Sequence, residues 1–528
     1  MNGKLRVAGI GLALSVMGGL VLLVVRPSLD PAQIRPLPLI AGAWLAFLVA
    51  AWLLRKVPKR TAVVLILLGG IGLQAVAVSV PRAYSNDLYR YMWDGRVQAA
   101  GIDPYQYVPT ATQLTGLRNE FLFYPEAEYC VSPSYVSSHP AAELTTGCTR
   151  INRPTVPTIY PPVAEAYFLA VYYLHPADDS SMPIQAATAA VAVLVTVLLL
   201  AGLGRLGRDV RMAALWAWCP TAILEAGNNA HVDVVAVAIT LAAILVLATA
   251  RTTRRTVAGG ILLGLAIATK LSPVLTVPAL LRRRWVTVAV SAASAFIVVY
   301  LPHVLLVGGK VIGFLPGYLH QENYTSGTRY GIIGLVIIGP LASVVAVLVM
   351  TAIALAVLQF SDPDRPWTGA LYMTAGALAV TTPNYQWYAL LLVMLVALDG
   401  RPEWLAFAAG GYYAAFPDLG VLHYIPGRVH DAVAYGVPLM IVGAGWLIRH
   451  ELARRAPVVT EPVVAEPVVA EPVAAEVVPV ATAPVATAPV ATAPVATAPV
   501  ATAPVATTSM ATEAGAAAAE PVGQEIPA

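Results

Sequence analysis

The sequence predicts an all-α membrane protein that crosses the bilayer many times. Of its 528 residues, 58% are hydrophobic and only 12% are charged, and the mean hydropathy is +0.71. Soluble domains carry roughly 25% charged residues, so a single soluble core is excluded. The arginines and lysines gather in short loops between apolar stretches of helical length, which is typical of cytoplasmic loops in a polytopic protein. These stretches predict a bundle of about 12–14 transmembrane helices.

Three apolar stretches of spanning length come first, at residues 7–25, 37–54 and 61–80. We interpret the first as a retained span, because no small-residue cleavage site of a signal peptide follows it. The dense basic loop 55–60 is expected on the cytoplasmic side. The third span therefore delivers the next part of the chain to the outer face.

A long polar loop, residues 81–161, is expected on that outer face. Cys130 and Cys148 lie in it and form a plausible disulfide if the loop is extracytoplasmic; two free thiols are the alternative. The short apolar segment 163–173 contains Glu165, and we predict a helix lying on or dipping into the outer surface rather than a span.

The remaining apolar segments alternate between polar clusters and arginine-rich loops. Two of them, 257–269 and 271–281, are short and predict a hairpin of short or re-entrant helices. The others are residues 182–203, 212–227, 231–250, 286–307, 331–360, 368–382, 389–398, 404–416 and 432–448. The alternation predicts a plasma-membrane protein with both termini in the cytoplasm.

The chain changes character at about residue 456. EPVVA-type repeats give way to TAPVA pentads, and a proline at every fifth residue prevents a stable helix. We therefore predict two parts, a transmembrane domain over residues 1–455 and a disordered cytoplasmic tail over residues 456–528.

The first outer loop opens with a helical pattern that carries charge. Asp87, Arg90 and Asp94 fall at i, i+3 and i+7, on one face of a helix that Ser85 or Asn86 could cap. An acid in the first turn is favoured by the helix dipole and stays ionised, as a general base requires. In the alternative interpretation Asp87 only caps the helix and Asp94 only pairs with Arg90.

Further polar and aromatic residues are expected on the same outer side, where they could bind a substrate. They are Tyr105, Tyr160, Asn228, His231, Asp233, Lys270, His320, Arg329, Asn384 and Trp387. Ionisable residues at membrane depth are costly and usually line functional cavities.

Each of these residues also has a structural alternative. His231 is either a ligand for a phosphate or sugar hydroxyl or an ordinary loop histidine. Asp233 lies inside an apolar run, which favours a function. Lys270 has no acid nearby in the sequence and suits a phosphate, although it could also extend to a membrane interface. Trp387 could stack on a sugar or belong to an interfacial aromatic belt.

Several classes of protein and site are excluded or left without support. No phosphate-binding GxxxxGK[ST] loop and no GxGxxG motif occurs, so an ATP-driven pump is not expected. The net charge of +3 gives no indication of nucleic-acid binding. No cysteine and histidine set has structural zinc spacing, and we assign no metal or cofactor. A divalent ion held jointly by Asp87, Asp94 and Asp233 remains open.

Five motifs resemble a known family. They are SNDLYRYMWDGRVQAAGIDPY at 85–105, TIYPPVAEAYF at 158–168, EAGNNAHVD at 225–233, TKLSP at 269–273 and TPNYQWY at 382–388. The arrangement resembles the GT-C class of polytopic glycosyltransferases, and within it family GT87 (DUF2029), which includes actinobacterial mannosyl- and arabinofuranosyltransferases.

The resemblance implies a GT-C-like helix bundle, a polyprenyl-phosphate sugar as donor and chemistry at the outer leaflet. It also implies that an acid in the first outer loop is the general base. Asp87 matches that position, and Asp94 is the second choice. The acceptor would be a cell-envelope glycolipid or polysaccharide, with mannose the favoured sugar.

Two other classes of protein remain as alternatives. A transporter or flippase of lipid-linked sugars would also place charges in cavities, but it predicts inverted repeats that the sequence does not display. A non-catalytic envelope scaffold would leave the charged first outer loop unexplained.

Overall fold

The computed structural model describes residues 2–25, 36–123, 149–416 and 427–455. The predicted pair Cys130 and Cys148 and the predicted tail, residues 456–528, lie outside the described residues. All described residues belong to one compact unit, Met1–Ala456.

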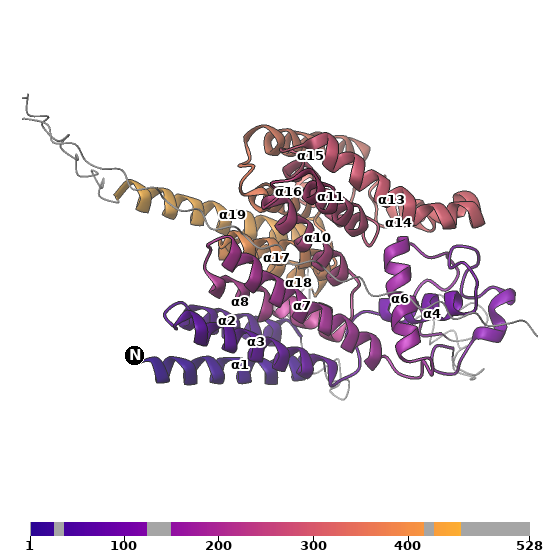
Figure 1. Cartoon of the computed structure of the whole chain (residues 1–528), viewed down its shortest axis with the longest axis horizontal. Helices are drawn as coiled ribbons and strands as arrows, with labels where there is room; N and C mark the ends of the chain where they lie inside the picture. The colour runs from indigo at the N-terminus through magenta and orange to yellow at the C-terminus, as the bar shows by residue number, and fades with distance from the viewer. Residues whose placement is uncertain (1, 26–35, 124–148, 417–426, 456–528) are drawn as a thin grey trace, which may run out of the picture. The chain divides into compact units, whose positions relative to one another are not determined.

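The all-α polytopic class is confirmed. In the described ranges, seven helical segments are long and apolar enough to cross a membrane (Figure 1). Each segment corresponds to one of the long helices α1 (Gly3–Val25), α2 (Pro36–Leu54), α3 (Lys59–Val78), α7 (Met182–Arg205), α13 (Trp285–Val307), α15 (Pro340–Phe360) and α19 (Gly427–Arg455). The stretch that starts with α13 continues to Gln321.

The other predicted spans form shorter helices packed between the long ones. These are α10 (Asp233–Ala248), α16 (Pro366–Thr381), α17 (Leu390–Asp399) and α18 (Ala406–Ala415). Helix α10 packs against α7, α16 against α15 and α17, and α18 against α19. Every residue from Leu390 to Leu398 is buried, so α17 lies in the middle of the bundle.

The predicted single span 212–227 is broken in the structure. It consists of η3 (Val210–Ala213), α8 (Ala214–Ala217), α9 (Pro220–Ala222) and the π-helical turn η4 (Ile223–Asn228). Pro220 has no N–H to donate to the preceding turn, so the helix cannot continue through it. The π-helical turn then carries the chain into the polar segment EAGNNAHVD.

The segment predicted as a hairpin of short helices forms α11 (Thr253–Ile267), η5 (Ser272–Thr276) and α12 (Val277–Leu280). It is not a packed hairpin, because α11 packs against α10 and α13 whereas α12 packs against α15 and α16. Helix α11 approaches α13 closely, because a Cβ at Gly264 would lie 2.2 Å from the carbonyl oxygen of Ala292. Small residues allow such backbone contact between membrane helices. This contact fixes the end of α11 from which Lys270 follows.

The predicted outer loop and the helix that follows it form a small folded region around α4 (Asp87–Ala99), η1 (Thr112–Leu117) and α6 (Pro162–Leu174). Tyr91 stacks on Phe168 with ring centroids 4.4 Å apart, and both side chains are buried. Helix α6 is therefore packed against α4, and its Glu165 is buried there rather than turned to a membrane surface.

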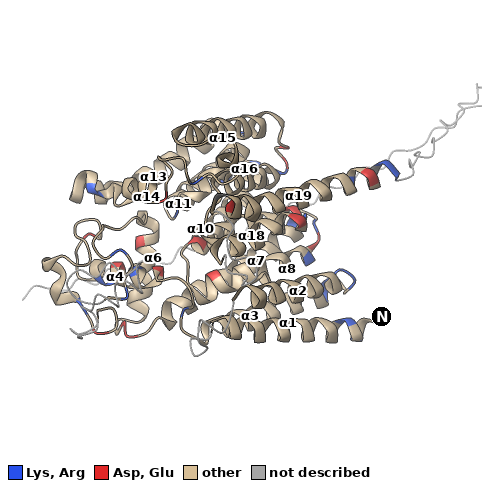
Figure 2. Ribbon diagram, turned by 180° about the vertical axis from the view of Figure 1, so that it is seen from behind, with Lys and Arg blue, Asp and Glu red and all other residues tan. Residues whose placement is uncertain are grey.

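Two backbone contacts join this region to the bundle. The N–H of Val163 donates to the carbonyl of Ala268 at 2.9 Å, just after α11. The N–H of Phe314 donates to the carbonyl of Thr158 at 3.2 Å, in the connection between η6 (Gly308–Ile312) and α14 (Leu315–Gln321). Most of each long helix is tan in Figure 2, whereas acidic and basic residues are concentrated around α4 and α6 and in the connections.

Candidate functional site

Asp87 begins α4, as the sequence predicts. Its backbone N–H donates to Ser85 Oγ at 3.2 Å, and Asn86 occupies the position before the helix. Asn152 Nδ2 donates to Asp87 Oδ1 at 2.6 Å, and the Asp87 side chain is 16% exposed. One carboxylate oxygen is thus held by a neutral donor while the group keeps access to the surroundings.

His231 lies next to the other oxygen of Asp87. His231 Nδ1 is 3.6 Å from Asp87 Oδ2, and His231 Nε2 is 3.5 Å from Glu225 Oε2. The imidazole is fully buried and stacks on Trp387 with ring centroids 4.0 Å apart. The ring is therefore a packed bridge between two carboxylates, and Trp387 holds its plane.

The π-helical turn fixes the orientation of Glu225. Tyr412 donates its hydroxyl to Glu225 Oε1 at 2.7 Å, and Asn229 Nδ2 donates to Glu225 Oε2 at 3.0 Å. Asn229 Oδ1 in turn accepts from the backbone N–H of Tyr84 at 3.2 Å and of Ser85. The turn and the start of α4 are thereby tied together by one amide side chain.

Asn228 also links the π-helical turn to the segment between α3 and α4. Its Nδ2 donates to carbonyls at the end of α3 and just beyond it, including Ala77 at 3.0 Å, and its Oδ1 accepts from the N–H of Ala83 at 2.8 Å. Both ends of this amide are occupied by backbone, so Asn228 positions the segment that leads to Asp87.

Lys270 and Asp233 form the second charged part of the site. Lys270 Nζ is 2.9 Å from Asp233 Oδ2, and it lies 5.2 Å from the ring centroid of Tyr160. Asp233 is in the first turn of α10. Lys270 has no acid near it in the sequence, but the fold places Asp233 beside it. Asp87 and Asp233 both act electrostatically on the buried hydroxyls of Tyr91 and Tyr160.

Arg90 and Asp94 are closed off from this site. Arg90 Nε bonds to both carboxylate oxygens of Asp94, at 2.9 and 3.0 Å, and donates from Nη1 to the carbonyl of Val156 at 3.0 Å. Both side chains are buried. The alternative in which Asp94 pairs with Arg90 is the observed arrangement, and Arg90 also connects α4 to the segment that contains Val156.

Glu165 lies beside this pair. It accepts hydrogen bonds from Thr158 Oγ1 at 2.8 Å and from Gln98 Nε2 at 2.9 Å. Burial raises the pKa of the Glu165 carboxyl well above its ordinary value, and the nearby Asp94 carboxylate adds to the rise. Burial therefore favours the protonated form of Glu165, whereas the Arg90 guanidinium favours the charged form of Asp94.

Tyr105 and Tyr160 are two buried tyrosines that contact each other. Tyr105 donates its hydroxyl to the carbonyl of Tyr160 at 2.6 Å. Tyr160 meets Tyr91 edge to face with ring centroids 4.9 Å apart. Both tyrosines are buried, and Tyr160 is the one beneath Lys270.

Residues after α13 form a third polar group. Arg329 Nη1 donates to Glu322 Oε2 at 2.7 Å, and Tyr385 donates to Glu322 Oε1 at 2.7 Å. Arg153 Nη2 is 3.8 Å from Glu322 Oε1. Tyr385 stacks on Trp387 with centroids 4.7 Å apart, which joins this group to His231. His320 and Asn384, also predicted for the site, are exposed.

The geometry is that of a polar site at one end of an apolar bundle, with an accessible carboxylate, a nearby lysine and stacked aromatic rings. Comparison with family profiles adds the class of protein. The model of glycosyltransferase family 87 matches residues 158–379. The family resemblance of the sequence is thereby confirmed. Searches of curated proteins and of solved structures found no match.

The family 87 region contains part of the site. Three of the five motifs lie in it, and it holds Tyr160, Asn228, His231, Asp233, Lys270, His320 and Arg329. Asp87, Arg90, Asp94, Tyr105, Asn384 and Trp387 lie outside the matched residues. The contacts of Asp87 and Trp387 with His231 connect these outer residues to the glycosyltransferase region.

Asp87, Asp94 and Asp233, the three acids that could have shared an ion, do not converge on one point. Asp94 is bonded to Arg90, and Asp233 to Lys270. Within the described ranges no three histidine, cysteine, aspartate or glutamate side chains are grouped so that they could hold an ion.

Sequence reasoning missed Asn152 and Glu225 as members of the site. Asn152 lies 65 residues from Asp87, in a loop with no pattern that marks it. Glu225 carries a signal, since it is an acid between apolar segments and is fully buried. Tyr412 has no such signal, because its hydroxyl reaches Glu225 across 187 residues of chain.

Proposed function

We propose that this glycosyltransferase moves a sugar, mannose in the first instance, from a polyprenyl-phosphate donor to a cell-envelope glycolipid or polysaccharide. The reaction takes place at the outer face of the plasma membrane, with both chain termini in the cytoplasm. The observation that carries the proposal is Asp87, an accessible carboxylate in contact with His231 of the family 87 region.

Asp87 acts as the general base in this proposal. Asn152 occupies Oδ1 as a hydrogen-bond donor, and Oδ2 is beyond hydrogen-bond distance from His231. Oδ2 therefore keeps a lone pair for the hydroxyl proton of the acceptor. The acceptor oxygen forms its bond to the anomeric carbon as that proton transfers to Asp87. The bond from the anomeric carbon to the donor phosphate breaks, and the phosphate leaves with the electron pair, so the configuration inverts.

The leaving phosphate needs positive charge and no proton. Lys270 is a compact cation at the site, and Asp233 and the Tyr160 ring hold its position. Arg329 offers a second cation, since its Nε and Nη2 make no hydrogen bond to other described residues. The exposed His320 lies on the same segment. Tyr385, which stacks on Trp387, supplies an aromatic ring near His231 against which a sugar ring can pack.

The test is sugar transfer in membranes that contain the full chain. Membranes with wild-type protein or the Asp87→Asn variant receive radiolabelled polyprenyl-phosphate mannose. We expect label in a lipid or polymer with the wild type and at least a hundredfold less with the variant. Equal transfer by both proteins would remove Asp87 as the base.

The arabinofuranosyl donor is the second arm of this test. Transfer from that donor alone would keep the reaction class and change the sugar. Movement of the intact donor across the membrane without a new glycosidic bond would replace the transferase by a flippase.

A further inference from the structure

A hollow lies at the other end of α10 and α11, away from Asp233 and Lys270. Leu247 and Thr256 contribute to its wall from these two helices, and Arg282, Arg283 and Arg284 come from the connection before α13. Pro363 closes it from the loop after α15. The 14 helical steps from Asp233 to Leu247 correspond to about 21 Å, so the hollow is separate from the proposed active site.

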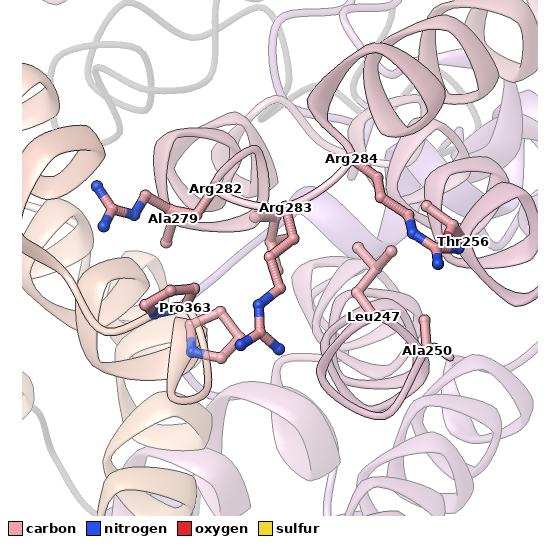
Figure 3. Close-up of a pocket in the computed structure, with 10 residues that line it drawn as sticks. Leu247, Ala250, Thr256, Ala279, Arg282, Arg283, Arg284 and Pro363 are labelled. Carbon is pink, nitrogen blue, oxygen red and sulfur yellow. The ribbon is translucent and has the colours of Figure 1, made fainter. Parts of the chain in front are cut away.

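The three arginines differ in how they are held (Figure 3). Arg282 donates to the backbone carbonyl of Leu358, and its side chain extends to the far side of Ala279. Arg284 extends to Thr256 and donates to its Oγ1 at 3.4 Å, and it also donates to the carbonyl of Arg251 at 3.2 Å.

Arg283 is paired with an exposed acid, whereas Arg282 and Arg284 donate to backbone carbonyls. Arg283 extends toward the Pro363 side of the hollow, and its Nη2 is 2.8 Å from Asp364 Oδ1. The side chains of Arg283 and Asp364 are 57% and 71% exposed. An exposed ion pair of this kind contributes little free energy, so a stronger anion can displace Asp364 from Arg283.

Exposed apolar side chains stand next to the arginines. Trp285 and Val286 begin α13 directly after Arg284, and they are 63% and 52% exposed. Phe360, at the end of α15, is 82% exposed. Tryptophan is enriched where a membrane meets water, and these helices offer apolar surface to lipid chains. Charge in a hollow and apolar surface beside it match the two parts of a phospholipid.

We propose that this hollow binds the phosphate of an anionic phospholipid, with Arg283 on the phosphate and the acyl chains along α13. Arginine suits a phosphate because its planar guanidinium donates two parallel hydrogen bonds to the phosphate oxygens. A soluble phosphate ester presents the same group without the chains. This site is independent of the proposed sugar transfer, because it uses none of the residues around Asp87.

The experiment is a lipid titration of the full chain purified in detergent, followed by native mass spectrometry. The ligands are dioctanoyl phosphatidylglycerol, which is anionic, and dioctanoyl phosphatidylcholine, which is zwitterionic. The variants are Arg283→Gln and the matched control Arg254→Gln, an exposed arginine in the first turn of α11 that does not line the hollow. We expect Arg283→Gln to bind phosphatidylglycerol about tenfold more weakly than the wild type, and Arg254→Gln to bind it as the wild type does.

A third variant changes binding in the opposite direction. Asp364→Asn removes the carboxylate that competes for Arg283, so it should bind phosphatidylglycerol several-fold more tightly than the wild type. A merely structural ion pair would give no such gain.

Three results would overturn or redirect the proposal. Equal affinity for the two lipids would overturn it, as would equal loss in Arg283→Gln and Arg254→Gln. Binding of glycerol 3-phosphate as tightly as phosphatidylglycerol would keep the phosphate site and assign it to a soluble ester. Because the readout is bound mass, failure of the sugar-transfer test leaves this result unaffected.

Discussion

Helix α4 carries two carboxylates two turns apart, and their surroundings are opposite. Asp87 has one neutral donor, Asn152, and its side chain is 16% exposed. Asp94 has both oxygens bonded to the Arg90 guanidinium, and its side chain is 2% exposed. The same helix therefore holds one acid that can accept a proton from a bound molecule and one whose lone pairs are already used.

The difference shows how a charged helix can serve chemistry and packing at once. At the first turn, the dipole of α4 favours an ionised carboxylate without a cation beside it. At the third turn the dipole offers no such support, and a buried carboxylate needs an arginine. A substitution at Asp87 should therefore reduce activity, whereas one at Asp94 should reduce stability. The largest loss of activity is expected at Asp87.

The strongest test of the comparison is Asp87→Asn. The amide keeps the size of the carboxylate but cannot take a proton, so transfer should fall by roughly 10²–10⁴-fold, as is usual for loss of a general base. The thermal unfolding midpoint in detergent should stay near that of the wild type. Asp179→Asn is the matched control, since Asp179 is an exposed acid in the connection between α6 and α7. Transfer within threefold of wild type would place the base elsewhere.

At the third turn, Asp94→Asn should damage the fold. It leaves the Arg90 guanidinium buried without a countercharge, which costs about 3–5 kcal/mol of stability. We expect a lower unfolding midpoint and less folded protein in membranes. The double variant Arg90→Met with Asp94→Asn should be less destabilised than the sum of the two single variants, because the buried charge is gone. Normal stability with reduced transfer would instead make Asp94 a direct participant.

A smaller loss is expected for Lys270→Gln. The change removes the cation proposed for the leaving phosphate and leaves Asp233 without its partner, so transfer should fall roughly tenfold. Steady-state kinetics should show a fall in kcat that exceeds any rise in KM, because charge on the phosphate grows as the bond breaks. Lys310→Gln, at an exposed lysine, is the control. Unchanged kcat in Lys270→Gln would move the phosphate to Arg329.

The smallest expected effect is the contribution of Glu165 to the pH dependence of folding stability. Its pKa is raised in the folded protein, mainly by burial, so folding favours the protonated carboxyl. The stability from this group is complete below the ordinary glutamate pKa and is lost as pH rises through the raised value. The wild type should therefore lose up to about 1.4 kcal/mol per pH unit in that window. Glu165→Gln should lose less between pH 5 and pH 8, measured as unfolding midpoints; parallel curves would show that Glu165 is ionised when folded.

Much of this architecture follows from local pattern. A membrane span needs about 20 apolar residues, so the long helices could be predicted from composition alone. The first turn of α4 and the Arg90–Asp94 pair were also predictable, because both depend on spacing within one helix. The break at Pro220 has a visible cause, yet the π-helical turn after it does not, since it depends on packing against α3 and α7.

The contacts that complete the site could not be predicted in this way. Lys270 meets Asp233 across 37 residues, and Asn152 meets Asp87 across 65. Neither pair lies in one element, so no periodicity marks it. The sequence indicates that these polar residues share one side of the membrane, and folding decides which of them touch.

The π-helical turn η4 also sets the direction in which the residues after it leave the helix. It contains one more residue per hydrogen-bonded turn than an α-helix, and His231 comes three residues after its end. Deleting a single residue there would rotate the downstream chain by about 100° around the helix axis. His231 would then turn away from Asp87 while every side chain of the site was still present. Chain length at this turn is thus as important to the site as the chemistry of its residues.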